Sequence, residues 1–276
     1  MNYREKVINR RSFVKYLGVA AVACPTCMAA AGALASETKA TGEGAKKAAH
    51  GSAHWSYEGA EGPENWSGLS PKYGVCGQGF QQSPVNLAGE ISSGLGGISV
   101  NYNRMPLRVV NNGHTIQLNC DPGSGITLDG DKFALLQFHF HHPSEHAVDG
   151  HRFQMEAHFV HASNDGRLAV LGVFIEPGME NSLLAPIWDA MPMQAGPENK
   201  VASTMIQPED LLPTDRRYFR YMGSLTTPPC SQIVNWSVFR QPVRASSRQV
   251  GKYASLFPMN ARPLQSLHRR LLLGSQ

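Results

Sequence analysis

The histidines of this chain are concentrated in one short stretch, since seven of the eleven lie within residues 139–161. In a β-strand, successive side chains point to opposite faces, so residues i and i+2 share a face. The sequence Q-F-H-F-H therefore places Gln137, His139 and His141 together on one face of a predicted strand. Two imidazoles and an amide then point in the same direction.

A second histidine-bearing segment follows, M-E-A-H-F-V-H at residues 155–161. The same alternation puts Glu156, His158 and Val160 on one face of this strand. The connection between the two segments contains Asp149-Gly150, which is a turn signal. If the second strand returns antiparallel to the first, the third imidazole lies beside the other two.

Three neutral imidazoles that leave a fourth coordination position open form the pattern of a catalytic zinc site, whereas a closed four-ligand site is structural. Gln137 and Glu156 each precede a histidine by two residues on the same face, where they suit acceptors that fix the tautomer of a metal-binding imidazole. A single histidine on a strand is more commonly hydrogen-bonded or solvent-facing, and H-x-H alone is a weak signal. The three histidines with polar partners in phase favour a metal site.

The elements that must position these side chains are mostly strands. Short β-branched and aromatic runs, separated by Gly, Pro, Asn and Asp, are typical of a sheet protein. They predict strands at 98–102, 106–110, 114–119, 126–128, 133–141, 153–161, 168–175 and 232–239. Helical signals are few, at 182–188, 207–212 and 246–256. The composition, 42% hydrophobic and 17% charged, is that of a globular protein with a core.

Several motifs in order along the chain resemble the α-class carbonic anhydrases, in their bacterial, exported form. They are Q-F-H-F-H, S-E-H and E-x-H-x-V-H in the histidine stretch, H-W-x-Y at 54–57, G-P-E-x-W at 62–66, Q-S-P-V-N at 82–86, N-x-G-H at 111–114 and G-S-L-T-T-P-P at 223–229. The resemblance implies one domain of mainly β (α+β) class. Its core is expected to be a central, mostly antiparallel, twisted sheet of about ten strands with short peripheral helices.

The resemblance also implies the reaction, which is the reversible hydration of carbon dioxide to bicarbonate and a proton by zinc-bound hydroxide. Zn²⁺ is expected on His139, His141 and His158, where its Lewis acidity lowers the pKa of bound water. Thr226 matches the family residue that accepts the hydroxide's proton in a hydrogen bond. Its own hydroxyl then donates to a carboxylate, matched by Glu145, and this chain of contacts aims the hydroxide.

Further residues receive roles by their match to the family's motifs. Carbon dioxide is apolar, and its pocket wall is matched by Val160, Val170, Leu225, Val234 and Trp236, while Thr227 is expected to contact bicarbonate. His114 matches the residue that carries protons to buffer, which suits the ordinary pKa of histidine. The residues expected in its solvent network are Asn112, Gln117 and Tyr57. Among the remaining histidines, His142 is expected to face away from zinc, and His146 and His161 to be buried and hydrogen-bonded.

Three cysteines lie beyond the leader, at positions 76, 120 and 230. The resemblance implies a disulfide between Cys76 and Cys230, which chain-entropy arithmetic for so long a loop values at roughly 4–5 kcal/mol. Cys120 is then expected to be a buried small hydrophobe. The resemblance also implies cis peptide bonds at Ser83-Pro84 and Pro228-Pro229, and it places Asn260 and Arg262 in the C-terminal part of the core.

The first 35 residues resemble a bacterial twin-arginine export signal, with Arg10-Arg11 ahead of an Ala-rich apolar run. Cleavage is predicted after Ala35, while a retained membrane anchor or lipidation at Cys24 stays open. Residues 36–52 are predicted to form a flexible linker and residues 53–272 the catalytic domain. The predicted location is the periplasm or the exterior.

The net charge of +4 belongs to the leader, because the rest of the chain carries as many acidic as basic residues. No basic patch argues for nucleic acid. The expected partners are carbon dioxide and bicarbonate, with sulfonamides and anions as inhibitors, no stable membrane association after processing, and a homodimer left open. The alternatives are a zinc-hydroxide esterase for small esters and a non-catalytic binding module. Modules of that kind have usually lost a zinc histidine, and none is lost here.

Overall fold

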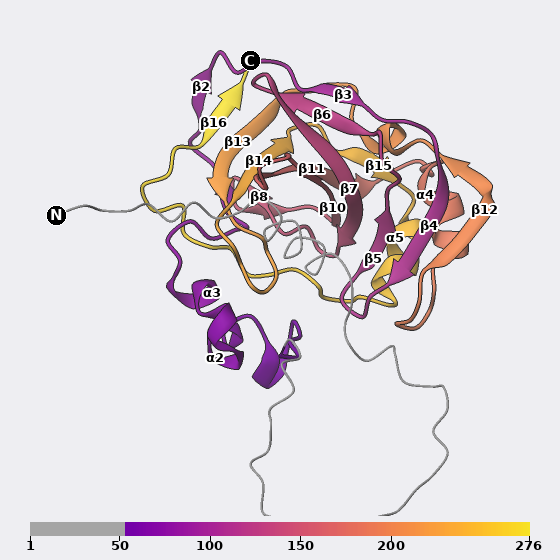
Figure 1. The fold of residues 1–276 in the computed structure, drawn as a ribbon, viewed down its shortest axis with the longest axis horizontal. Coiled ribbons are helices and arrows are strands. Elements are labelled where there is room, and N and C mark those ends of the chain that lie inside the picture. Colours follow the sequence, from indigo (N-terminus) through magenta and orange to yellow (C-terminus); the bar gives the residue numbers. More distant parts are fainter. Residues whose placement is uncertain (1–52) are drawn as a thin grey trace, which may run out of the picture. The chain divides into compact units, whose positions relative to one another are not determined.

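A large twisted sheet crosses the domain, and the β-branched and aromatic runs of the sequence build its strands (Figure 1). The structure, a computed structural model, describes residues 53–276, of which Trp55–Gln276 form one compact unit. The predicted export signal and linker lie outside the described residues. Among the helices of the described part, none is long and apolar enough to cross a membrane.

Within residues 53–276, thirteen strands belong to the main sheet. Ten of them follow one another in the order β12-β4-β5-β7-β10-β11-β14-β13-β16-β2, and β3, β6 and β15 attach beside this path. Their bounds are β2 Ile91–Ser93, β3 Ser99–Asn101, β4 Met105–Asn111, β5 Ile116–Asn119, β6 Gly125–Leu128, β7 Asp131–His141, β10 Met155–Ala162, β11 Leu168–Pro177, β12 Asn199–Ile206, β13 Tyr218–Gly223, β14 Val234–Phe239, β15 Val243–Ala245 and β16 Leu273–Ser275.

Most neighbouring strands are antiparallel, as the resemblance implies. The exceptions in the main sheet are that β14 and β15 run parallel to β11, and that β2 runs parallel to β16. The sheet is larger than the expected ten strands or so, and two of the attached strands, β3 and β6, lie at predicted segments. Because β16 pairs with β13, the compact unit extends to Gln276, four residues beyond the predicted end of the domain.

Helices are short and peripheral, as expected. The three predicted segments form α4 (Leu184–Ala190), the 3₁₀ turn η4 (Pro208–Leu211) and α5 (Ser247–Ala254). Helix α5 begins with a capping box, in which the Ser246 hydroxyl accepts from the Gln249 backbone N–H and the Gln249 side chain accepts in return. The sequence did not predict the N-terminal turns, η2 Gly59–Glu61, α2 Trp66–Leu69, η3 Pro71–Tyr73 and α3 Val75–Gln78.

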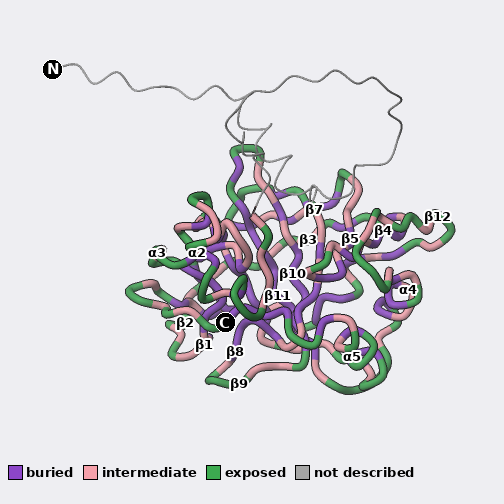
Figure 2. Tube along the Cα trace, turned by 90° about the horizontal axis from the view of Figure 1, so that it is seen from below, coloured by how far each residue is buried: buried purple, intermediate pink, exposed green. Residues whose placement is uncertain are grey.

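Alternation along the central strands separates two buried faces. Phe138, Phe159 and Leu171 point into one apolar cluster, while Val170 and Trp236 point into another, on the opposite side. Figure 2 shows β10 and β11 as buried along most of their length, and the burial pattern of β11 is continuous for its first eight residues. Side chains on either face of these strands are therefore held in fixed positions by packing.

The connection between β7 and β10 is more than a turn. It contains a hairpin of β8 (Ala147–Val148) and β9 (His151–Arg152), and β8 also pairs with β1 (Asn86–Leu87). The predicted turn residues Asp149 and Gly150 join the hairpin with positive φ angles of 49° and 81°. The two expected cis peptide bonds are present, and His142-Pro143 adds a third among the described residues.

Candidate metal centre

Three imidazoles converge on the face of the sheet that carries Trp236. The antiparallel register of β7 and β10 places His158 directly opposite His139, as the alternation predicts. His141 lies one strand step farther along the same face of β7. One ring nitrogen from each histidine lies within 4.8 Å of those of the other two. The predicted ligand set is thus brought together by strand pairing alone.

The other ring nitrogen of each histidine is hydrogen-bonded. His139 Nδ1 donates to Gln137 Oε1 at 2.8 Å, and His158 Nε2 donates to Glu156 Oε1 at 2.9 Å, so both predicted acceptors are in place. His141 Nδ1 donates to the backbone carbonyl of Asn260 at 2.7 Å, a contact that the sequence did not reveal. These bonds fix each tautomer and leave a lone pair on His139 Nε2, His141 Nε2 and His158 Nδ1.

The three free nitrogens suit a zinc ion. His141 Nε2 is buried and has no hydrogen-bond partner among the described residues, so a metal would satisfy it. Burial is the main cause that lowers the pKa of His139 well below its ordinary value, and burial likewise lowers the pKa of His141. Both imidazoles are therefore neutral at physiological pH, which is the protonation state that binds a metal. Three nitrogen donors with a position left open match catalytic zinc.

Glu156 is the buried centre of a polar network behind the triad. Its carboxylate accepts from His158, from His146 Nδ1 at 2.8 Å and from the His146 backbone N–H at 2.9 Å. The neighbouring strand leaves room for it at Gly172, where an added Cβ would lie 2.9 Å from Glu156 Oε1. His146 in turn contacts the Tyr221 hydroxyl at 2.7 Å, which confirms it as a buried, hydrogen-bonded histidine.

Replacing Glu156 by glutamine is expected to loosen the metal. In the carboxylate, Oε1 accepts from both imidazoles and Oε2 accepts from the His146 backbone N–H, so the NH2 group of a glutamine would face an N–H donor in either orientation, and the orientation of His158 weakens. Zinc should dissociate about 10–100 times faster, as for other residues that orient metal ligands. The measurement is the rate of zinc transfer to a chromogenic chelator. Glu90→Gln, which removes a carboxylate paired with Arg240 at 2.9 Å, is the matched control and should leave this rate unchanged.

Glu145 reaches the triad, but not through the expected contact. Its side chain is fully buried, and Oε1 accepts from the Arg262 backbone N–H at 2.9 Å. Oε2 lies 3.5 Å from His141 Nε2 and has no hydrogen-bond partner among the described residues, so the expected bond from Thr226 is not formed. Oε2 lies beside the imidazoles instead, with His158 Nδ1 at 3.8 Å.

The residues expected to form the carbon dioxide pocket share one apolar cluster beside the triad. Val170, Val234 and Trp236 are buried there, and Val160 and Leu225 pack against them half-buried. The Trp236 ring lies edge-on to His158, with centroids 4.8 Å apart. Its indole N–H donates to the Ser224 carbonyl at 3.0 Å and so anchors the loop that carries buried Thr226 and half-buried Thr227.

The expected shuttle residue lies in the loop between β4 and β5. The His114 imidazole stacks on Trp55, with ring centroids 3.7 Å apart and planes within 8° of parallel. Asn112 holds the loop, since its Oδ1 accepts from the backbone N–H groups of His114 and Thr115 at 2.9 and 3.0 Å. Asn112 also reaches Gln117, at a long 3.5 Å. Gln117 pairs with His139 in the β5–β7 register, which brings the loop beside the triad.

The remaining histidines lie as expected, whereas the role of Tyr57 in a solvent network stays a prediction. Tyr57 packs edge-on against Trp55 and Trp66, and burial raises the pKa of its hydroxyl well above the ordinary value. His142 turns away from the triad, with Nδ1 3.0 Å from the Pro258 carbonyl. His161 is buried between the Tyr102 hydroxyl and the Ala169 carbonyl.

A disulfide joins Cys76 and Cys230, as the resemblance implied. Arg262 donates to the Cys76 carbonyl at 2.8 Å, and Gln82 donates to the Cys230 carbonyl at 3.1 Å. The bond therefore links the N-terminal turns to the loop of Thr226. Cys120 is half-buried against the other core cluster, where burial raises the pKa of its thiol to about 12, in keeping with the expected hydrophobic role.

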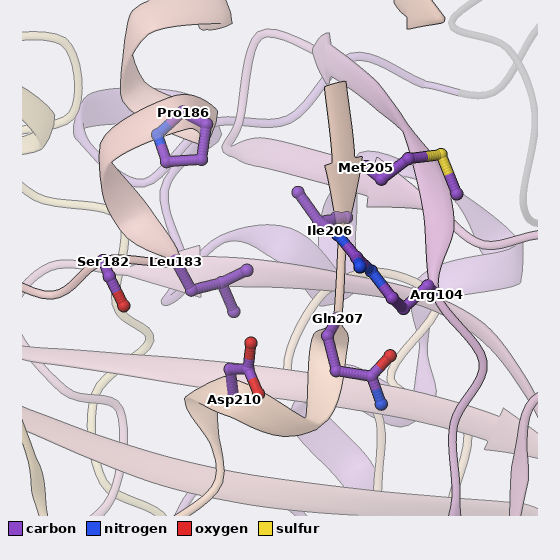
Figure 3. A pocket seen from close by; sticks show the side chains of 8 residues that line it. All are labelled: Arg104, Ser182, Leu183, Pro186, Met205, Ile206, Gln207 and Asp210. Carbon is purple, nitrogen blue, oxygen red and sulfur yellow. The ribbon is translucent and has the colours of Figure 1, made fainter. Parts of the chain in front are cut away.

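A separate pocket of about 380 Å³ lies away from the triad, between α4, η4 and the start of β4 (Figure 3). It contains none of the residues predicted for catalysis. Figure 3 shows the Arg104 side chain extending into it from the right and the Asp210 carboxylate pointing up into it, with the apolar Leu183 and Pro186 above Asp210. The lining residues are Arg104, Ser182, Leu183, Pro186, Met205, Ile206, Gln207 and Asp210.

A mostly antiparallel sheet that presents three converging imidazoles beside an apolar wall defines a class of protein, the metal-dependent hydratases and hydrolases that activate water. Comparison with known proteins identifies the family within that class. The profile of the eukaryotic-type carbonic anhydrases matches residues 61–276, and this chain belongs to that family. It is accordingly an enzyme, a carbonic anhydrase.

Named relatives agree with this assignment. A carbonic anhydrase from Nostoc sp. is 44% identical over 225 residues, covering 80% of this chain and 85% of the relative. The α-carbonic anhydrase of Thermovibrio ammonificans, solved with sulfanilamide, has a TM-score of 0.79 and 45% identity, covering 81% of this chain and all of that one. The α-carbonic anhydrase of Photobacterium profundum has a TM-score of 0.76 and 40% identity, covering 80% and 100%.

Proposed function

We propose that this protein hydrates carbon dioxide with a zinc ion held by His139, His141 and His158. The observation that carries the proposal is the convergence of three ring nitrogens within 4.8 Å, one of them buried without a partner. Bound zinc supplies the Lewis acidity that makes hydroxide available near neutral pH. The neutral ligand set leaves the full charge of the metal to act on water.

The chain's own residues position the reactants. The apolar wall of Val170, Val234 and Trp236 admits carbon dioxide beside the triad and excludes competing water. Thr226 lies buried in the loop that Trp236 anchors, and its hydroxyl is proposed to orient the attacking oxygen. The bond from Thr226 to Glu145 is not formed in this structure, but Glu145 Oε2 is buried without a hydrogen-bond partner among the described residues and is proposed to accept from Thr226 once the metal holds the imidazoles. Thr227, half-buried in the same loop, is proposed to contact bicarbonate.

Stopped-flow hydration of carbon dioxide by the purified protein, with zinc content measured on the same sample, tests this function. The expected result is hydration that scales with bound zinc and is inhibited by sulfonamides and by small anions. Sulfanilamide is the first inhibitor to use, because it was bound in the Thermovibrio ammonificans structure. Full hydration by zinc-free protein would contradict the proposal.

His114 is proposed to carry the proton from the metal centre to buffer. Replacing it by alanine should lower kcat in dilute buffer by about 100-fold, the lower end of the range for a lost proton-transfer group, while kcat/KM changes little. Concentrated imidazole should restore kcat. The measurement is kcat against buffer concentration, with His54→Ala as an exposed-histidine control. A variant whose kcat does not depend on buffer would remove the shuttle role.

We also propose that the protein works in the periplasm after twin-arginine export. The Cys76–Cys230 disulfide supports this, because such bonds persist in oxidising compartments. Fractionation of cells that express the full chain, with the N-terminus of the mature protein sequenced, tests both the location and the predicted cleavage after Ala35. The homodimer that the sequence left open is tested by sedimentation of the purified protein.

A further inference from the structure

Asn260 is the point at which the C-terminal segment contacts the end of the metal-ligand strand. It is 1% exposed. Its backbone carbonyl accepts from the His141 imidazole, and its backbone N–H donates to the His142 carbonyl at 3.0 Å. Its side-chain Oδ1 accepts from the His142 backbone N–H at 2.7 Å. The whole residue is therefore fixed relative to the ligand His141.

The side-chain amide nitrogen of Asn260 points to different partners. Nδ2 lies 2.9 Å from the His114 carbonyl, 3.0 Å from the Phe140 carbonyl and 3.0 Å from the Tyr253 hydroxyl. An amide has two hydrogens, so two of the three acceptors share one of them. The contact with the His114 carbonyl joins two segments 146 residues apart in the chain.

This contact stands where the strand ladder has ended. The registered pairs between β5 and β7 run from Asn119–Gln137 to Gln117–His139 and so stop three residues short of His114. Beyond this point, side-chain hydrogen bonds connect the loop to β7. The Phe140 carbonyl accepts from the Thr115 hydroxyl at 2.6 Å and from the Tyr253 hydroxyl at 2.5 Å, besides Asn260. These bonds tie the His114 loop to the strand that carries the metal ligands.

We propose that the Asn260 side-chain amide is a positioning residue for proton transfer, which rests on the proposed shuttle role of His114. The Asn112 side chain accepts from the His114 backbone N–H, and the Asn260 side chain donates to the His114 carbonyl. The backbone carbonyl of the same Asn260 orients His141. These two hydrogen bonds to the His114 backbone fix the distance between the shuttle imidazole and the metal centre. Losing the Asn260 bond should slow proton transfer while leaving the hydration step intact.

The test uses Asn260→Asp and Asn260→Ala. Both keep the backbone carbonyl that accepts from His141, and both lose the N–H donors to His114. In the zinc-loaded enzyme, kcat in dilute buffer should fall about tenfold, with kcat/KM within about twofold, because a displaced proton donor slows only the transfer step. In the zinc-free protein, hydrogen exchange of the 113–115 amides should speed up about tenfold, as expected for a lost hydrogen bond.

Met259→Ala is the matched control. It changes the neighbouring residue of the same segment, whose side chain is exposed and makes none of these hydrogen bonds, so it should change neither kcat in dilute buffer nor exchange at 113–115. The double variant His114→Ala/Asn260→Ala should be no slower in dilute buffer than His114→Ala alone.

Two results would overturn the proposal. One is unchanged exchange at residues 113–115 in both Asn260 variants. The other is a parallel fall of kcat and kcat/KM, which would place the role of Asn260 at the metal. If His114→Ala shows no dependence on buffer, the shuttle role fails instead, and the exchange measurement still decides whether Asn260 holds the loop.

Discussion

Replacing His139 by alanine is expected to abolish zinc binding and carbon dioxide hydration together. One of three ligands carries about a third of the binding free energy, and with about 10–16 kcal/mol for a protein zinc site its loss weakens the affinity roughly a thousandfold. The open coordination geometry that activates water is lost with it. The measurements are zinc content after dialysis against a weak chelator and stopped-flow hydration on the same samples.

The matched control is His151→Ala, because this histidine belongs to the same stretch but is exposed in the β8–β9 hairpin. It should keep both zinc and activity. Retained hydration in His139→Ala, with the fold intact by circular dichroism, would show that the metal lies elsewhere. The second buried group that could hold a metal, His146, Glu156 and His158, would then be the place to search.

The histidine triad could be predicted because its geometry depends only on the strand repeat and on the pairing of two strands. The two-residue repeat of strands puts His139 and His141 on one face, and one antiparallel register then fixes His158 opposite His139. The acceptors Gln137 and Glu156 follow from the same repeat. The eight strands that the sequence predicted are all present, since each is a run of β-branched or aromatic residues between turn residues.

The strands that the sequence missed have a weak or interrupted pattern. β12 is an exposed edge strand of mixed polar residues, and the aromatic run of β13 is interrupted by a buried Arg220. Likewise, the contacts that complete the site join distant parts of the chain. The bond from His141 to the Asn260 carbonyl spans 119 residues, and that from Arg262 to Glu145 spans 117. The motif match located Asn260 in the core, but no periodicity could give its partners.

Removing the disulfide by Cys76→Ser/Cys230→Ser is expected to lower the free energy of unfolding by roughly 4–5 kcal/mol, because a cross-link over so long a loop restricts the unfolded chain. The sequence separation is 154 residues. Since whole domains have only about 5–15 kcal/mol of stability, the change is large. Urea unfolding of the oxidised wild type and the double variant measures it. Cys120→Ser, which changes a half-buried thiol outside any disulfide, should stay within about 1 kcal/mol of wild type.

The native fold of the double variant should persist, because the ends of the disulfide are also held by other bonds. Arg262 donates to the Cys76 carbonyl and Gln82 to the Cys230 carbonyl, and neither bond needs the sulfur atoms. Zinc content and kcat/KM at low temperature should therefore remain near those of wild type while the unfolding midpoint falls. If activity is lost at temperatures where the protein is still folded, the disulfide acts directly on the loop of Thr226, and unfolded-state entropy is not its main effect.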